Sequence, residues 1–314
     1  MPSDPIPALL RRVSERRIRR DTFALSKDPL PFRTLSHTRP GQAKTTLDEA
    51  DDFLQARLES CGYAVERQGC LVQAFRRDRT KNIHHQYSPP HAHDPWRVAW
   101  NLSVRKTGSS TPDEAIVLVS HKDSQSWIAS PGANDNALGT AANLELARVL
   151  ARYRSRRSFW FLFCNEEHWP WTSVAAARGA RLRGEKIVAV FNIDGPGVRK
   201  PEDRAAGRMT CYSVFYAPEA ERLADLMVEV NRDYALGLIA RRHKVDRPGN
   251  DDGSFIKEGY RIAVHNIGSM PYADPNYHLE GDVPECCDYP SAAATARATL
   301  AAVVRLDLGW KISP

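Results

Sequence analysis

Three apolar runs constrain the fold of this chain most strongly. They read AIVLVS, SFWFLFCN and KIVAVFNI, and they are rich in β-branched and aromatic residues. Strands without regular polar alternation are typical of parallel sheets that are buried on both faces by helices. Segments with apolar residues at helical spacing lie between and around these runs. We therefore expect an α/β fold, a three-layer α/β/α sandwich with a mixed, mostly parallel central sheet.

Each of the three runs ends next to a residue that can bind a metal ion. His121 follows the first run, Glu166 and Glu167 follow the second, and Asp194 follows the third. In open α/β sheets, ligands gather at the carboxyl ends of the strands. The topology alone should therefore bring these side chains into one crevice.

Two further potential ligands are Asp135 in PGANDN and His278 in YH. A carboxylate shared by two ions, with one histidine and one other carboxylate for each ion, suits a pair of zinc ions, and cobalt or manganese would fit similar shells. Such pairs serve hydrolysis by activating a shared water. Adjacent side chains at an extended strand end point to different sides, so one glutamate can bind metal while the other moves a proton. We assign Glu167 to metal and Glu166 to proton transfer.

Two residues near these ligands have supporting roles in this interpretation. Asp123 lies two positions after His121, on the same face of an extended segment, and can orient the imidazole by accepting its second N–H. The segment LGTAANLELARVLARY has apolar residues at helical spacing. Asp135 would therefore lie just ahead of a helix, with Asn136 as the N-terminal cap.

In this order the motifs resemble the co-catalytic zinc aminopeptidase family, the metallopeptidases that also include glutamate carboxypeptidases and glutaminyl cyclases. The resemblance runs from Asn101 to Asp282 and includes HKDS, PGANDN, NEEH, NID and YHLEGD. It implies a zinc-exopeptidase fold with two Zn²⁺ per chain and with Glu166 as the general base. One zinc would be held by His121 and Asp194 and the other by Glu167 and His278, with Asp135 bridging them.

The chain departs from the family pattern at two places near these motifs. HWPWTS follows the glutamate pair where the family usually has glycines, and Asp252 in NDDGSF replaces a family histidine. That histidine is not one of the five zinc ligands, so its loss concerns a substrate contact or an outer contact. We expect a different pocket wall, for which the candidate residues are Trp169, Trp171, Asp251, Phe255 and Tyr277.

The bulk properties favour one catalytic domain over residues 1–314, in which residues 1–40 form a basic N-terminal helix and an extended arm. The chain has no low-complexity linker, no apolar secretory core near its start and no stretch long enough to span a bilayer. Its six cysteines lack zinc-finger spacing, which favours free thiols in a cytoplasmic protein. The net charge of +6 fits solvated arginine-rich faces, so we expect neither nucleic acid nor membrane as a partner.

Four histidines in His84–His93 favour a polar loop at the cleft rim over an extra metal site.

The predicted function is that of a metal-dependent exopeptidase, an aminopeptidase acting on peptide or amide bonds in small substrates. One alternative is a glutaminyl-peptide cyclotransferase with a single zinc, against which the complete second metal shell argues. The other is a non-catalytic binding protein on the same fold, against which the intact ligand set argues. Counting bound metal and testing for hydrolysis separates the three.

Overall fold

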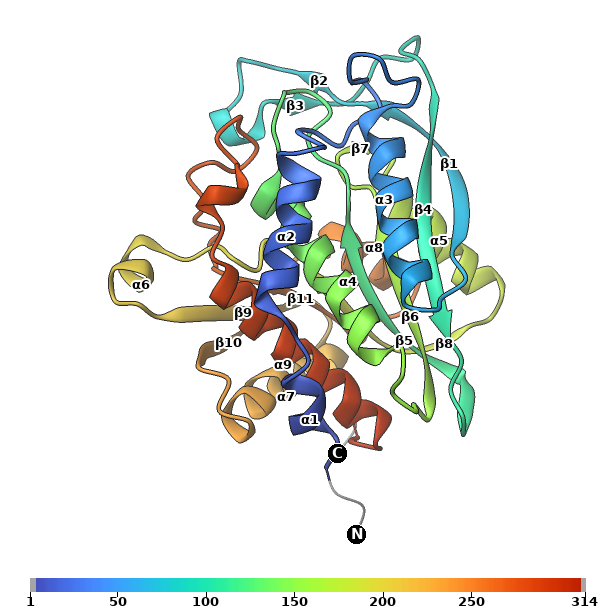
Figure 1. Cartoon of the computed structure of the whole chain (residues 1–314), viewed down its shortest axis with the longest axis vertical. Coiled ribbons are helices and arrows are strands. Elements are labelled where there is room, and N and C mark those ends of the chain that lie inside the picture. The colour runs from blue at the N-terminus through green and yellow to red at the C-terminus, as the bar shows by residue number, and fades with distance from the viewer. Residues whose placement is uncertain (1–3, 312–314) are drawn as a thin grey trace.

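The computed structural model describes residues 4–311 of the chain. Over these residues the main sheet has nine strands, in the order β10-β9-β11-β8-β5-β6-β4-β1-β7 (Figure 1). The four central strands run parallel to their neighbours within this group; they are β11 (Ala263–Ile267), β8 (Lys186–Ile193), β5 (Thr111–His121) and β6 (Arg157–Cys164). The outer strands are β10 (Leu238–Lys244), β9 (Met209–Phe215), β4 (Arg97–Lys106), β1 (Glu66–Ala74) and β7 (His168–Trp169). Antiparallel pairing begins at β9 on one side of the central strands and at β4 on the other, which makes the sheet mixed.

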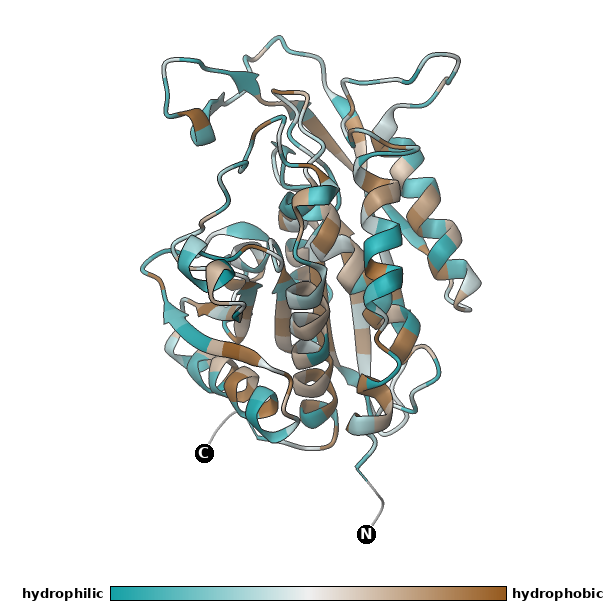
Figure 2. Cartoon of the chain, turned by 60° about the vertical axis from the view of Figure 1, so that its left-hand side comes forward, coloured by the Kyte–Doolittle hydropathy of each residue, from teal (hydrophilic) through white to brown (hydrophobic). Residues whose placement is uncertain are grey.

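Helices cover both faces of this sheet, which confirms the predicted three-layer sandwich. One face is covered by α3 (Thr46–Ser60), α4 (Leu138–Leu150), α7 (Glu221–Asp233) and α9 (Tyr289–Asp307) (Figure 1). The other is covered by α5 (Thr172–Leu182) and α8 (Asn250–Lys257). Shorter elements are α6 (Pro201–Ala205), the strand pair β2 (Arg76–Arg77) and β3 (Tyr87–Ser88), and single turns at Ile83–His85, Ala133–Ala137, Pro218–Ala220 and Pro284–Cys286. Hydrophilic residues predominate in the outlying loops (Figure 2).

Strand β5 illustrates why the apolar runs became central strands. Ile116 and Leu118 pack into the larger core on the α4 side, whereas Val117 and Val119 pack into the core on the α5 and α8 side. All four side chains are completely buried. A strand whose alternate side chains both enter cores gains from apolar residues at every position. None of the helices within residues 4–311 combines the length and apolarity needed to cross a membrane.

The N-terminal segment differs in detail from the predicted single helix and arm. It forms two helices, α1 (Ile6–Leu10) and α2 (Glu15–Ser26). The chain breaks between them because Ser14 is an N-cap whose hydroxyl accepts from the Arg17 N–H. The arm that follows carries a completely buried Arg33, whose guanidinium donates to the carbonyls of Leu25, Lys122, Pro131 and Gly132. The arm is thereby fixed to the carboxyl end of β5.

A buried ion pair joins α3 to the same end of the sheet. Asp51 and Lys122 are both completely buried, and Lys122 Nζ lies 2.6 Å from Asp51 Oδ1 and 2.8 Å from Asn165 Oδ1. Replacing Asp51 by Asn should lower the free energy of unfolding by about 3–5 kcal/mol, because the ammonium group is left buried without a counter-charge. Urea denaturation monitored by circular dichroism measures this change.

The matched control is the double variant Asp51→Leu with Lys122→Met, which removes both charges together. It should recover most of the lost stability, since paired apolar side chains of similar volume often replace a buried ion pair at little cost. A loss below about 1 kcal/mol for the single variant, as is usual for an exposed pair, would contradict this account.

Candidate metal centre

The carboxyl ends of the central strands carry most of the predicted ligands. His121 is the last residue of β5, Asp194 directly follows β8, and Glu166 and Glu167 lie two and three residues after the end of β6. Because these strands are parallel neighbours, their ends lie at one edge of the sheet. The predicted convergence of these side chains is therefore present in the structure.

The donor atoms form two groups that share one carboxylate. In the first group, His121 Nε2 lies 3.1 Å from Asp135 Oδ1 and 3.6 Å from Asp194 Oδ1. In the second, His278 Nε2 lies 3.2 Å from Asp135 Oδ2 and 3.4 Å from Glu167 Oε1. Each oxygen of Asp135 therefore faces a different imidazole, as a bridging carboxylate requires.

The spacing and chemistry of these donors fit zinc. A tetrahedral ion with bonds of about 2.0–2.1 Å has about 3.3–3.4 Å between its ligand atoms. The four separations between imidazole nitrogens and carboxylate oxygens lie between 3.1 and 3.6 Å. Each group supplies one nitrogen and two oxygens, which leaves a fourth position for water or substrate. The residues present therefore fit two divalent ions of the zinc class.

The electrostatics of the cluster also favour bound cations. Burial would lower the pKa of His278, but Glu167 and Asp135 outweigh burial and raise this pKa to about 10. Burial likewise opposes the charged form of His121, yet the carboxyls of Asp123, Asp135 and Asp194 raise its pKa well above the usual value. These four carboxyls thus favour positive charge on the two imidazoles. Divalent ions would supply this charge in place of protons.

Asp123 accepts hydrogen bonds from several residues of the metal centre. Its Oδ1 lies 3.3 Å from His121 Nδ1 and accepts from the backbone N–H of Glu166 at 2.9 Å. Its Oδ2 accepts from the backbone N–H of Glu167 at 2.8 Å and lies 2.7 Å from His168 Nδ1. Asp123 therefore contacts His121 as the orienting role requires, and it also holds the peptide that carries both glutamates.

Two side chains that sequence reasoning did not single out support Asp135. Gln125 Nε2 donates to Asp135 Oδ2 at 2.9 Å and to Glu167 Oε1 at 3.2 Å, so it orients two ligands of the second group. Asp282 accepts the backbone N–H groups of Asn134 and Asp135 at 2.8 and 3.1 Å. Gln125 lies two residues after Asp123, and Asp282 closes the YHLEGD motif. The position of Gln125 beside Asp123 and the position of Asp282 within YHLEGD are the sequence features that could have identified these two residues.

The turn that presents Asp135 begins at Gly132, which has a φ of 56°. A Cβ at this position would lie 2.5 Å from the Asp135 carbonyl oxygen, so only glycine fits both the conformation and the space. Helix α4 begins at Leu138, and Asn136 Oδ1 accepts from the Gly139 N–H at 3.0 Å. The N-cap of α4 is Ala137 rather than the predicted Asn136, although Asn136, one residue earlier, makes this contact with the first turn of the helix.

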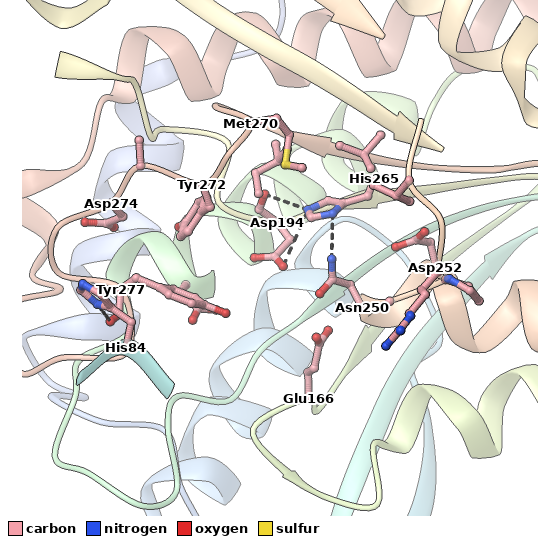
Figure 3. A pocket seen from close by; sticks show the side chains of 18 of the residues that line it. His84, Glu166, Asp194, Asn250, Asp252, His265, Met270, Tyr272, Asp274 and Tyr277 are labelled. Carbon is pink, nitrogen blue, oxygen red and sulfur yellow. Dashed lines mark hydrogen bonds and ion pairs between the residues drawn. The ribbon is translucent and has the colours of Figure 1, made fainter. Parts of the chain in front are cut away.

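Glu166 is not a member of either donor group. Its carboxylate lines the cavity beside them, and its Oε2 has no hydrogen-bond partner among the described residues (Figure 3). Burial and the neighbouring Asp251 carboxyl raise the pKa of Glu166 well above its usual value, while His121 lowers it. A free carboxylate with raised proton affinity beside a metal centre can accept a proton from a reacting water.

A cavity of about 640 Å³ opens above the donor groups. Its apolar wall includes Val214, Val245, Ile267 and Met270, and its polar wall includes His84, Asn250, Asp252, His265, Asp274 and Tyr277. Figure 3 shows Asp194 and Glu166 pointing into the same space, with His265 and Asn250 beside Asp194. A cavity of this size accommodates a small ligand such as one terminal residue of a peptide with part of the next.

Four of the five predicted pocket residues lie outside the cavity wall, and only Tyr277 lines it. Phe255 is completely buried on the far face of the sheet, where it packs against Trp160. Asp251 is also completely buried, in the first turn of α8. Trp169 is 48% exposed at the sheet edge, and Trp171 is the N-cap residue of α5. None of these four side chains lines the cavity, although Asp251 lies close enough to Glu166 to raise its pKa.

The position where the family has a histidine is occupied by Asp252, which lines the cavity and accepts from Asn192 Nδ2 at 3.3 Å. A histidine from another element lies in this region. His265, on β11, has its Nδ1 2.9 Å from Asn250 Nδ2 and its Nε2 3.3 Å from the Asp194 carbonyl oxygen. Sequence reasoning missed His265, because nothing in RIAVHNIG distinguishes it from a core histidine.

The histidine-rich loop contributes to the cavity wall rather than to a further donor group among the described residues. His84 and His85 line the cavity. The His84 carbonyl oxygen lies 2.8 Å from His278 Nδ1, where it accepts the second N–H of the imidazole. Among the described residues, neither donor group contains a histidine of this loop. Its predicted place at the cleft rim therefore holds for His84 and His85.

The chain matches the model of peptidase family M28 over residues 101–303. A probable aminopeptidase of Saccharomyces cerevisiae is 28% identical over 181 residues, which cover 54% of this chain and 46% of that protein. A probable zinc metalloprotease of Pyrenophora teres f. teres is 25% identical over 300 residues, which cover 81% of this chain and 59% of that protein. This chain spans about half the length of the curated relatives that it matches.

Solved structures with the same fold include both peptidases and cyclases. The LapA aminopeptidase of Legionella pneumophila has a TM-score of 0.72 at 16% identity, with 98% of this chain and 75% of that chain covered. A glutaminyl cyclase of Bacteroides thetaiotaomicron bound to N-acetylhistamine has a TM-score of 0.69 at 14% identity, with 95% and 99% covered. At these identities the likeness establishes the fold alone.

Proposed function

The chain belongs to peptidase family M28, and on this premise we propose that it is a zinc-dependent aminopeptidase that hydrolyses peptide or amide bonds in small substrates. The observation that carries the proposal is the position of Asp135, whose two oxygens face the imidazoles of two separate donor groups. Glu166, which is outside both groups, faces the same cavity. These features together would hold two divalent ions and leave a free base beside them.

In the proposed reaction, zinc ions held by the two donor groups would supply Lewis acidity toward the attacking water and the scissile carbonyl. Glu166 accepts the proton of that water on its carboxylate and returns it to the leaving amine. Asp123 holds the backbone N–H of Glu166 at 2.9 Å, which fixes the base relative to the donor groups. Gln125 keeps Asp135 and Glu167 aligned through its two donated hydrogen bonds.

The cavity supports the exopeptidase part of the proposal. Its volume of about 640 Å³ suits the end of a peptide better than a long extended chain. The lining residues Val214, Val245, Ile267 and Met270 suit an apolar side chain, and His84 and His85 also line the cavity. The substrate class that fits is a short peptide or an aminoacyl amide.

A substrate panel with matched blocking groups tests this function. Purified protein loaded with zinc should hydrolyse aminoacyl amides that have a free α-amine and should not hydrolyse their N-acetylated counterparts. Activity should disappear with a chelator and return with zinc. Equal hydrolysis of free and blocked substrates, or none of either, would reject the aminopeptidase proposal.

A glutaminyl cyclase reaction is the second candidate, supported by cyclases among the structures with this fold. The same protein should then form pyroglutamate from peptides with N-terminal glutamine and should bind about one zinc per chain. The complete second donor group favours the aminopeptidase. A non-catalytic binding role would leave both reactions absent despite bound zinc.

The cytoplasmic location also remains a prediction. All six cysteines lie within the described residues and are free, which is consistent with a reducing compartment. Cell fractionation with antibody detection tests the location directly.

A further inference from the structure

His168 directly follows the glutamate pair and is the first residue of β7. Its side chain is completely buried, although it takes no part in either donor group. Strand β7 pairs with β1 at the sheet edge, with His168 opposite Ala74. Alternation along this short strand turns His168 inward toward the metal centre while Trp169 faces solvent.

The contacts of His168 fix its tautomer. Its Nδ1 lies 2.7 Å from Asp123 Oδ2, and its Nε2 lies 3.4 Å from the Leu35 backbone nitrogen and 3.3 Å from Thr34 Oγ1. The Leu35 amide can only donate, so Nε2 must accept and the ring proton must be on Nδ1. In this tautomer the Nδ1–H donates to Asp123.

This bond is the shortest of the four that Asp123 accepts. The other three come from His121 Nδ1 at 3.3 Å and from the backbone N–H groups of Glu166 and Glu167 at 2.9 and 2.8 Å. Each of those three belongs to a residue of the candidate centre itself. His168 is therefore the one donor to Asp123, among the described residues, that connects the centre to the surrounding structure.

We propose that His168 is a positioning residue for the metal centre. Its Nδ1–H holds Asp123 in place, and Asp123 in turn fixes the His121 imidazole and the peptide that carries both glutamates. Thr34 and Leu35 hold the other side of the ring, so the N-terminal arm, which precedes the family-matched residues 101–303, takes part in the positioning. The proposal rests on the proposed function only for its kinetic readout.

Two substitutions at His168 test the hydrogen bonds of Nδ1 and of Nε2 separately. The side-chain amide nitrogen of Asn can occupy the place of the histidine Nδ1, so His168→Asn keeps a donor for Asp123 and loses the contact with the arm. The longer Gln places its amide near the histidine Nε2, so His168→Gln keeps a partner for Leu35 and loses the donor. Both variants lose one buried contact, and thermal unfolding of the metal-free proteins should show similar decreases.

Zinc affinity is the first readout, measured by competition with a chromogenic chelator. His168→Gln should weaken one of the two binding steps by about 10–100-fold, as is typical when a partner behind a metal ligand is lost. His168→Asn should bind zinc within about threefold of the wild type. At saturating zinc, the Gln variant should have a lower kcat with little change in KM, since the base is displaced while the cavity wall is kept.

The double variant with Asp123→Ala tests whether His168 acts through Asp123. In that background, His168→Gln should cause no further loss of zinc affinity, because the acceptor is already absent. Wild-type zinc affinity in the Gln variant, equal losses for Asn and Gln, or additive losses in the double variant would overturn the proposal. Zinc affinity is measured without substrate, so these outcomes are distinguishable from a failure of the aminopeptidase function.

Discussion

Replacing Glu166 by Gln should lower kcat by about 10²–10⁴-fold while the protein still binds zinc at both groups. The reason is that Gln has nearly the same shape as Glu but cannot accept the proton of the attacking water. Glu166 lies outside both donor groups, so its loss removes no ligand. Stopped or continuous assays with an aminoacyl amide give kcat, and elemental analysis of the same preparation gives the zinc content.

The neighbouring glutamate provides the matched control. Glu167 Oε1 lies 3.4 Å from His278 Nε2 within the second donor group. Replacing Glu167 by Gln should therefore reduce the zinc content, in contrast to the same change at Glu166. If the Glu166 variant retains wild-type kcat, or if it loses zinc as the Glu167 variant does, the assignment of the two roles is wrong.

Replacing Asp135 by Asn should have an effect of similar size through a different mechanism. Asn keeps one oxygen but replaces the other with an NH₂ group, which cannot bind a cation. One donor group would keep its oxygen from residue 135 and the other would lose it. We expect tightly bound zinc to fall from two ions to about one per chain, and kcat/KM to fall about 10³-fold, which corresponds to about 4 kcal/mol.

Asp251 serves as the control for this substitution. It is a completely buried carboxyl that belongs to neither donor group. Replacing Asp251 by Asn should therefore leave two zinc ions per chain, measured by the same elemental analysis. Loss of both ions from the Asp135 variant together with loss of zinc from the Asp251 variant would indicate general misfolding rather than removal of a bridge.

The central strands and the ligand set could be predicted because both depend on local sequence. Val117 and Ile116 pack into cores on opposite faces, so the buried middle of β5, residues 115–119, had to be apolar at every position. His121 and Asp194 lie at strand ends, where the topology alone determines that their side chains meet. The distances between these residues did not need to be known from the sequence, because a parallel sheet brings the carboxyl ends of neighbouring strands together.

The cavity wall could not be predicted in the same way, because it depends on how loops turn. Trp169 follows the glutamate pair closely, yet β7 pairs at the sheet edge and leaves its side chain 48% exposed. Phe255 points from α8 into the core, whereas Asn250 and Asp252 at the start of the same helix line the cavity. His265 on β11 and Gln125 directly after HKDS contact the ligands, yet neither residue belongs to a motif that marks it. Directions of single side chains in loops are set by tertiary packing.

The proposed mechanism depends on one carboxylate, Asp135, that two cations share in one cavity. Anomalous X-ray scattering at the zinc absorption edge from crystals of zinc-loaded protein tests it most directly. We expect two peaks about 3.5–4 Å apart, one between His121 and Asp194 and the other between Glu167 and His278, with an oxygen of Asp135 at each. A single peak, or two peaks that do not both contact Asp135, would contradict it.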